Sequence, residues 1–229
     1  MNIASASRAE KRPALVWDLP TRVFHWLLAA SFAIAWLSAE SERWQLLHIT
    51  AGYTVAGLVA FRLVWGVIGT RHARFAGFVR GPRAVFAYLR SLARGRPEHH
   101  AGHNPAGAVA IVGLLALAAL TTATGWANLN ELGGHWVGEV HEAFASTMLG
   151  LVVAHVAAVI VSSRLHRENL VASMVHGRKP VPATEGIRRP WRIVGVLLLA
   201  AVLGFWYVQW QAAPGAHAAA AAGRADPDD

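Results

Sequence analysis

One apolar stretch constrains this chain more than any other. Residues 138–163, GEVHEAFASTMLGLVVAHVAAVIVSS, are long enough to cross a bilayer as a single helix. Two histidines, His141 and His155, lie inside it, 14 residues apart. In an α-helix this interval corresponds to about 21 Å along the axis and a net rotation of about −40°. The stretch therefore predicts two imidazoles on one helix face, one near each side of the membrane, where a polar side chain is expected to be functional.

The composition favours a membrane protein and narrows its metal chemistry. Of the 229 residues, 55% are hydrophobic and only 15% are charged. The absence of cysteine excludes disulfides, iron–sulfur clusters, thiolate zinc sites and covalently attached c-type haem, which leaves histidine as the chief candidate metal ligand. The net charge of +8 comes from basic blocks between apolar segments, so we expect no nucleic-acid partner.

Four further apolar segments accompany this stretch, so the expected fold class is all-α integral membrane. We expect spans at residues 21–39, 44–68, 105–126 and 193–210 in addition to 138–163. The first follows a basic region, as the core of a signal peptide does, but no clear A-x-A cleavage site follows it, so we expect it to be retained. After the second span, RAVFAYLRSLARG predicts a short amphipathic helix at the membrane surface.

The distribution of Lys and Arg predicts the orientation of these spans. Four lie in residues 1–22, seven in residues 71–96 and seven in residues 164–192, together 18 of the 21 in the chain. Because cytoplasmic segments carry the excess of basic residues, we expect a cytoplasmic N-terminus, a periplasmic C-terminus and an odd number of spans. The expected location is the bacterial inner membrane, with lipid as a partner.

Orientation gives each intramembrane histidine a depth. His25 lies near the inner side and His48 near the outer side, because their spans run in opposite directions. The span that carries His141 on the outer side brings His155 about 21 Å nearer the cytoplasm. Depth therefore pairs His25 with His155 and His48 with His141. A lone histidine in an apolar helix is more often a hydrogen-bonded core residue than a ligand, but two depth-matched pairs favour the axial ligation of two haems.

A buried arginine and three glycines accompany the histidines on the second span. Arg62 follows His48 by 14 residues, so it shares the face of His48 at the depth of the inner pair. A buried guanidinium requires an anion, such as a haem propionate, whereas an arginine near a helix end can also extend its head group to the interface. The glycines leave room either for a neighbouring helix or for a flat ligand; they are Gly52, Gly57 and Gly66.

The remaining histidines lack this arrangement. We expect His135 to face away from His155, and His166 to lie outside the hydrocarbon beside two arginines. The others are expected to be solvated in loops or the tail; they are His72, His99, His100, His103, His176 and His217. The cluster of His99, His100 and His103 could bind an adventitious metal ion.

Together these residues resemble the bacterial di-haem cytochrome b561 family and the related cytochrome b subunits of membrane-bound nickel–iron hydrogenases. The matching pieces are RVFHW at His25, LLHITAG at His48, and the HE and AH pairs that hold His141 and His155. The resemblance covers residues 18–179, and it implies that His25 and His155 hold an inner haem while His48 and His141 hold an outer one. The family moves electrons between a quinone and a redox partner at one membrane face.

We therefore expect a four-helix transmembrane bundle binding two noncovalent b haems, plus a fifth C-terminal transmembrane helix. The expected divisions are a cytoplasmic tail at 1–19, the four-helix domain at 20–179, a linker with the fifth helix at 180–211, and a disordered tail at 212–229. Quinone is an expected partner, and a hydrogenase, a c-type cytochrome and a second copy of the chain are further candidates. The alternatives are a histidine-lined metal-ion or proton transporter and a purely structural membrane subunit.

Overall fold

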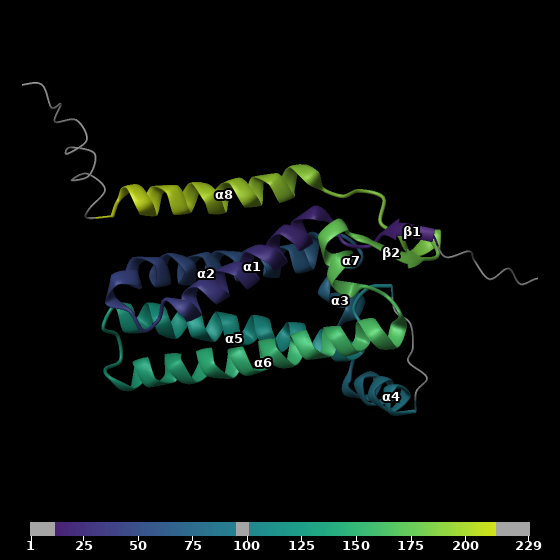
Figure 1. The fold of residues 1–229 in the computed structure, drawn as a ribbon, viewed down its shortest axis with the longest axis horizontal. Helices are drawn as coiled ribbons and strands as arrows, with labels where there is room; N and C mark the ends of the chain where they lie inside the picture. Colours follow the sequence, from purple (N-terminus) through teal and green to yellow (C-terminus); the bar gives the residue numbers. More distant parts are fainter. Residues whose placement is uncertain (1–11, 95–100, 214–229) are drawn as a thin grey trace, which may run out of the picture.

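Five long helices run side by side along the longest axis of the molecule (Figure 1). The computed structural model describes residues 12–94 and 101–213. In chain order the helices are α1 (Leu19–Leu37), α2 (Gln45–Ile68), α5 (Pro105–Leu129), α6 (Trp136–His166) and α8 (Arg192–Gln211). α1 packs on α2 and α8, α2 packs on α5, and α5 packs on α6. Each lies within a few residues of a segment that the apolar pattern predicts.

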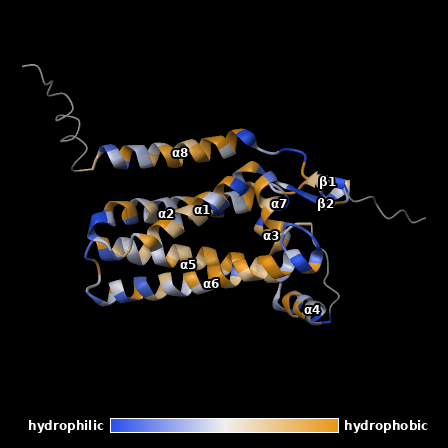
Figure 2. Ribbon diagram, viewed as in Figure 1, coloured by the Kyte–Doolittle hydropathy of each residue, from blue (hydrophilic) through white to orange (hydrophobic). Residues whose placement is uncertain are grey.

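Four stretches of helix are long and apolar enough to cross a membrane: residues 42–68, 105–129, 136–166 and 192–211. α1 is not among them, because its first two turns include Arg22 and His25 and lower its apolar content. α1 nevertheless lies alongside α2 through the bundle (Figure 1). Figure 2 shows hydrophobic residues along the long helices and many hydrophilic residues near their ends, as the bilayer requires.

The short elements gather at one end of the bundle (Figure 1). α3 (Phe75–Phe78) and α4 (Pro82–Ala93) follow α2, and α4 confirms the helix predicted from RAVFAYLRSLARG. α7 (Leu170–His176), β2 (Arg178–Val181) and the turn η2 (Ala183–Glu185) follow α6, while the turn η1 (Glu42–Trp44) precedes α2 at the opposite end. This end holds the basic segments of the chain.

The N-terminal segment is not a free tail along its whole length. Residues Arg12–Leu15 form β1, which pairs antiparallel with β2, so that Arg12 lies opposite Val181. The backbone N–H groups of Val16 and Trp17 then donate to the carbonyl of Gly177, at 2.8 and 3.0 Å. The predicted boundaries at 19 and 179 therefore cut through a small sheet, because strand pairing joins segments more than 160 residues apart. The expected disorder after residue 212 falls almost entirely outside the described residues.

Two N-caps fix the helix starts at this end of the bundle. Asp18 accepts the backbone N–H of Thr21 at 2.8 Å, and Asn104 accepts that of Gly107 at 2.7 Å. Each cap is followed by a proline in the first turn of its helix, where the missing N–H costs nothing. The other oxygen of Asp18 accepts from Thr70 Oγ1 at 2.5 Å and from Trp65 Nε1 at 3.3 Å. Asp18 thus ties the start of α1 to the end of α2.

The apolar core lies between α1, α2, α5 and α6. Its buried members are Phe24, Val55, Leu58, Val59, Leu115, Ala118 and Met148. α8 lies on the outside of this group and is linked to α2 by a hydrogen bond of 2.8 Å from Trp206 Nε1 to Thr54 Oγ1. Within the described residues, α6 packs closely on α5 but not on α1 or α2. The side of α6 that carries the histidines therefore has no tight helix packing against α1 or α2.

Candidate functional site

His48 and His141 meet near one end of the bundle. Their ring centroids are 6.2 Å apart and their planes are 80° apart. His48 Nδ1 lies 2.8 Å from the carbonyl oxygen of Ala35 on α1, and His141 Nδ1 lies 2.9 Å from that of Thr121 on α5. A carbonyl oxygen only accepts hydrogen bonds, so each Nδ1 carries the proton and each Nε2 keeps its lone pair. This is the tautomer that a metal ligand needs.

A glycine on α5 makes room for the ring of His141. A Cβ added at Gly125 would lie 2.8 Å from His141 Cε1 and 3.0 Å from His141 Nδ1. Any larger residue would therefore displace the imidazole from the carbonyl of Thr121. Gly125 was not predicted from the sequence, because its segment contains no histidine and gives no indication of which neighbour it faces.

His25 and His155 lie at the other level of the bundle. Both are half-buried, on α1 and α6, and they are close enough to interact electrostatically, although the described rings make no direct contact. The Nδ1 atom of His25 is buried and has no hydrogen-bond partner among the described residues. Its ring packs edge-on against Trp26 with centroids 5.1 Å apart. A buried imidazole nitrogen without a partner is costly, and it marks a place where a further group would be stabilising.

Arg62 is buried beside this inner level instead of reaching the interface. Only 2% of it is exposed, and its guanidinium carbon lies 4.7 Å from the ring centre of Phe75 and 5.9 Å from that of Phe78. Asp18 is within electrostatic range, but no ion pair between them is found in the described residues. Arg62 Nη1 is buried without a partner. The site therefore has a buried cation that lacks a bound anion.

The three glycines of α2 divide into two kinds. A Cβ at Gly66 would run into the ring of Phe75, so this glycine serves packing within the protein. A Cβ at Gly52 or Gly57 would meet nothing within 4 Å. Gly52 lies one turn after His48 and on the same face of α2. The open side next to Gly52 is where a flat group held by His48 would lie.

Two histidines predicted to be solvated are instead packed into the protein. His103 precedes α5 and lies against Trp17 and Phe78, each with ring centroids 4.6 Å apart from its own. His72 places Nε2 2.7 Å from the carbonyl oxygen of Glu185. The prediction was wrong because the loop after α2 folds back under β1, and only the tertiary structure brings Trp17 to His103. His99, His100 and His217 lie outside the described residues.

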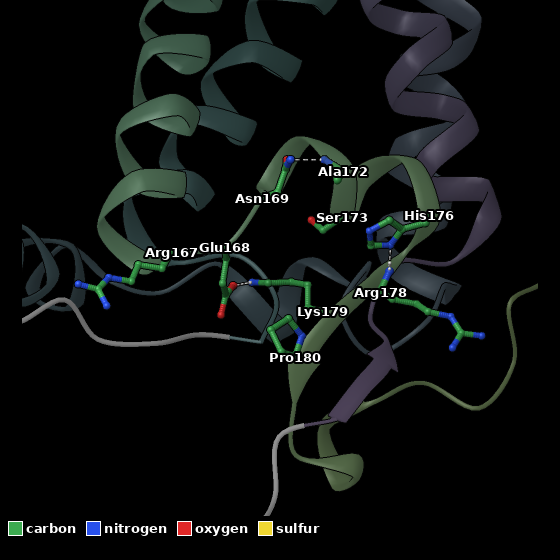
Figure 3. Close-up of a pocket in the computed structure, with 9 residues that line it drawn as sticks. All are labelled: Arg167, Glu168, Asn169, Ala172, Ser173, His176, Arg178, Lys179 and Pro180. Carbon is green, nitrogen blue, oxygen red and sulfur yellow. Dashed lines mark hydrogen bonds and ion pairs between the residues drawn. The ribbon is translucent and has the colours of Figure 1, made fainter.

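A cavity between the end of α6, α7 and β2 is separate from the histidine pairs (Figure 3). Lys179 pairs with Glu168 at 3.4 Å, and the N-cap Asn169 bonds to Ala172. Arg167 and Arg178 point away from this pair in opposite directions (Figure 3). The polar groups here are used to hold α7 and β2 in place.

Comparison with known proteins agrees with this arrangement. The family of prokaryotic cytochrome b561 proteins matches residues 16–177, which include α1, α2, α5 and α6. A protein of Bradyrhizobium diazoefficiens, named "Probable Ni/Fe-hydrogenase B-type cytochrome subunit", is 24% identical over 77% of this chain and 90% of its own length. No solved structure matches the chain. The chain therefore belongs to the prokaryotic cytochrome b561 family, as a multi-pass membrane b-type cytochrome that acts in electron transfer.

Proposed function

We propose that this chain binds two b haems and carries electrons across the bacterial inner membrane between a quinone pool and a redox partner protein. The observation that carries the proposal is the pair of Nδ1 hydrogen bonds that leave Nε2 of His48 and of His141 available to a metal. His48 and His141 would hold the outer haem, and His25 and His155 the inner one. Two histidines per iron leave no open coordination position, which suits electron transfer better than substrate chemistry.

The described residues fit a haem at both levels. Two metal–nitrogen bonds of about 2 Å, together with the radii of the rings, separate the imidazole centroids by about 6 Å, and the measured separation of His48 and His141 is 6.2 Å. The open side at Gly52 leaves space for a planar group. At the inner level, the unpartnered Nη1 of Arg62 would bind a propionate.

The residues of the chain set position and electrostatics. Each haem, when bound, supplies a one-electron Fe(III)/Fe(II) couple. His141 and His155 lie on one unbroken helix, α6, which fixes their axial separation at about 21 Å. The carbonyls of Ala35 and Thr121 orient the outer ligands and increase their basicity. The buried charge of Arg62 favours the reduced inner iron by offsetting negative charge nearby.

The proposed orientation rests on where the basic residues lie. The basic segments after α2 and α6 are at the same end of the bundle as Asp18, and the positive-inside rule assigns that end to the cytoplasm. α1, α2, α5, α6 and α8 then form five spans, with the C-terminus in the periplasm. We extend the name of the Bradyrhizobium relative to propose a hydrogenase as the redox partner.

The test is the haem content of the purified chain. A reduced-minus-oxidised absorption spectrum of the detergent-solubilised protein, with pyridine haemochrome quantification, should give two b haems per chain. One haem would overturn the two-site assignment while leaving a b-type cytochrome. A full-length, folded chain without haem would overturn the proposal and favour a histidine-lined transporter. Reduction of the purified protein by a quinol, measured by stopped-flow absorbance, tests the quinone separately.

A further inference from the structure

His103 occupies an unusual place for a loop histidine. It lies two residues before α5, and its ring is tilted 48° against Trp17 and 52° against Phe78, with both centroids at 4.6 Å. Trp17 precedes α1 and Phe78 belongs to α3, so three separate segments enclose the ring. Aromatic contacts on two sides fix the plane of the imidazole and restrict where its nitrogens point.

The Nδ1 atom of His103 has no partner among the described residues, although it is buried. Burial, followed by the charge of Arg62, lowers the pKa of His103 to about 3, so the ring is neutral at neutral pH and carries one N–H. A buried polar atom left without a hydrogen bond costs about 1–3 kcal/mol. The ring is thus held firmly with a donor that binds nothing in the protein.

Arg62 has the same deficiency on the other side of Phe78. Its guanidinium lies over Phe78 at 5.9 Å, and its Nη1 is also buried without a partner. Phe78 therefore contacts both His103 and Arg62. Two unpaired donors from different elements, α2 and the loop before α5, come together at one point of the fold.

The neighbouring acidic groups are already engaged. Asp18 accepts hydrogen bonds from Thr21, Thr70 and Trp65, and Glu168 pairs with Lys179. The groups within electrostatic range of His103 are Arg62, His72, Lys179 and His155, all of them basic. The described surroundings of His103 and Arg62 therefore favour a negatively charged ligand with oxygen acceptors.

We propose that His103 and Arg62 bind the two propionate groups of the inner haem, His103 through Nδ1–H and Arg62 through Nη1. The proposal rests on the proposed function, because it requires a haem between His25 and His155. It agrees with the position of His103 within electrostatic range of His155. Haem b carries two carboxylates on one edge, and two separate donors would fix the rotation of the macrocycle about its iron–histidine axis. His103 is a positioning residue here and does not ligate iron.

The test compares His103→Phe with His103→Asn in the full-length protein. Phenylalanine keeps the packing between Trp17 and Phe78 but removes the donor, whereas asparagine restores a donor close to the position of Nδ1. His176→Ala is the matched control, because His176 is exposed at the same end of the bundle. The measurements are an optical redox titration that resolves both haems and resonance Raman spectra of the propionate bending modes.

For His103→Phe we expect a tenfold shift of the inner-haem equilibrium towards Fe(III), which is about 59 mV for a one-electron couple. The propionate bending band should shift, the outer haem should keep its potential, and His103→Asn should restore both inner-haem signals. An unchanged inner potential and an unchanged band in His103→Phe would overturn the proposal. If His103→Phe loses the inner haem, its recovery in His103→Asn supports the proposal and its continued loss overturns it. Absence of haem from the wild-type chain would instead overturn the proposed function.

Discussion

The imidazole rings of His48 and His141 lie 6.2 Å apart, and each is held from behind by a backbone carbonyl of a different helix. His48 on α2 bonds to Ala35 on α1, and His141 on α6 bonds to Thr121 on α5. All four helices of the bundle therefore determine one site. Neither ring can turn without losing a buried hydrogen bond, which keeps each Nε2 aimed into the space between α2 and α6.

Replacing His48 or His141 by Ala should remove the outer haem and leave the inner one. Each substitution removes one of two axial ligands, and the remaining histidine cannot hold a noncovalent haem firmly in its site. Pyridine haemochrome quantification should fall from two haems per chain to one. His135→Ala is the control, because His135 is exposed and paired only with Glu139 at 3.4 Å. Retention of both haems in the His48→Ala and His141→Ala double variant would contradict the assignment.

Replacing His25 or His155 by Ala should have the opposite result, with loss of the inner haem and retention of the outer one. The two sites are about 21 Å apart along α6, so removal of one should not disturb the other. Redox titration should show a single remaining component with the potential of the outer haem. The pairing by depth is wrong if His25→Ala removes the same component as His48→Ala.

Gly125→Val should weaken the outer site without removing any ligand. A Cβ at this position would lie 2.8 Å from His141 Cε1, so the ring must move away from Thr121. Overpacking of this kind costs about 1–3 kcal/mol, which lowers haem affinity by roughly tenfold or more. Haem retention during gel filtration measures the effect. Gly150→Val on α6 is the matched control, because a Cβ there meets nothing within 4 Å.

Arg62→Ala should retain the inner haem and lower its midpoint potential. Removing a buried cation favours the oxidised, more positive iron, and a loss of about 1.4 kcal/mol corresponds to about 59 mV for a one-electron couple. Arg62→Lys should recover part of the shift, because lysine keeps the charge but loses the planar fork. Optical redox titration gives both values, with the outer haem as an internal reference. An unchanged inner potential in Arg62→Ala would exclude a contact between Arg62 and a propionate.

Asp18→Ala should destabilise the junction of α1 and α2. Asp18 is fully buried, caps α1 through Thr21, and accepts from Thr70 and Trp65 on the α2 side. Loss of a cap together with charge-assisted hydrogen bonds should cost about 2–4 kcal/mol. Asn104→Ala removes a cap with a single hydrogen bond and should cost about 1 kcal/mol. Thermal unfolding in detergent, followed by tryptophan fluorescence, would show a larger decrease for Asp18→Ala; equal decreases would contradict the role of Asp18 as a link.

The sequence by itself determined the long helices and the depths of their histidines. Apolar length defines a span, and the interval between His141 and His155 defines their separation, because rise and rotation within a helix are set by local backbone hydrogen bonds. The same regularity related Arg62 to His48. Pairing by depth then needed only the direction of each helix, which the basic segments supply.

The tertiary structure alone decided how those histidines are oriented and what surrounds them. The carbonyls of Ala35 and Thr121 reach the rings only after α1 packs on α2 and α5 packs on α6. The burial of His103 beside Trp17 likewise depends on contacts between residues 86 positions apart in the chain. Local sequence patterns carry no information about such contacts, because helix rotation and loop return are set by the packing of side chains from distant segments.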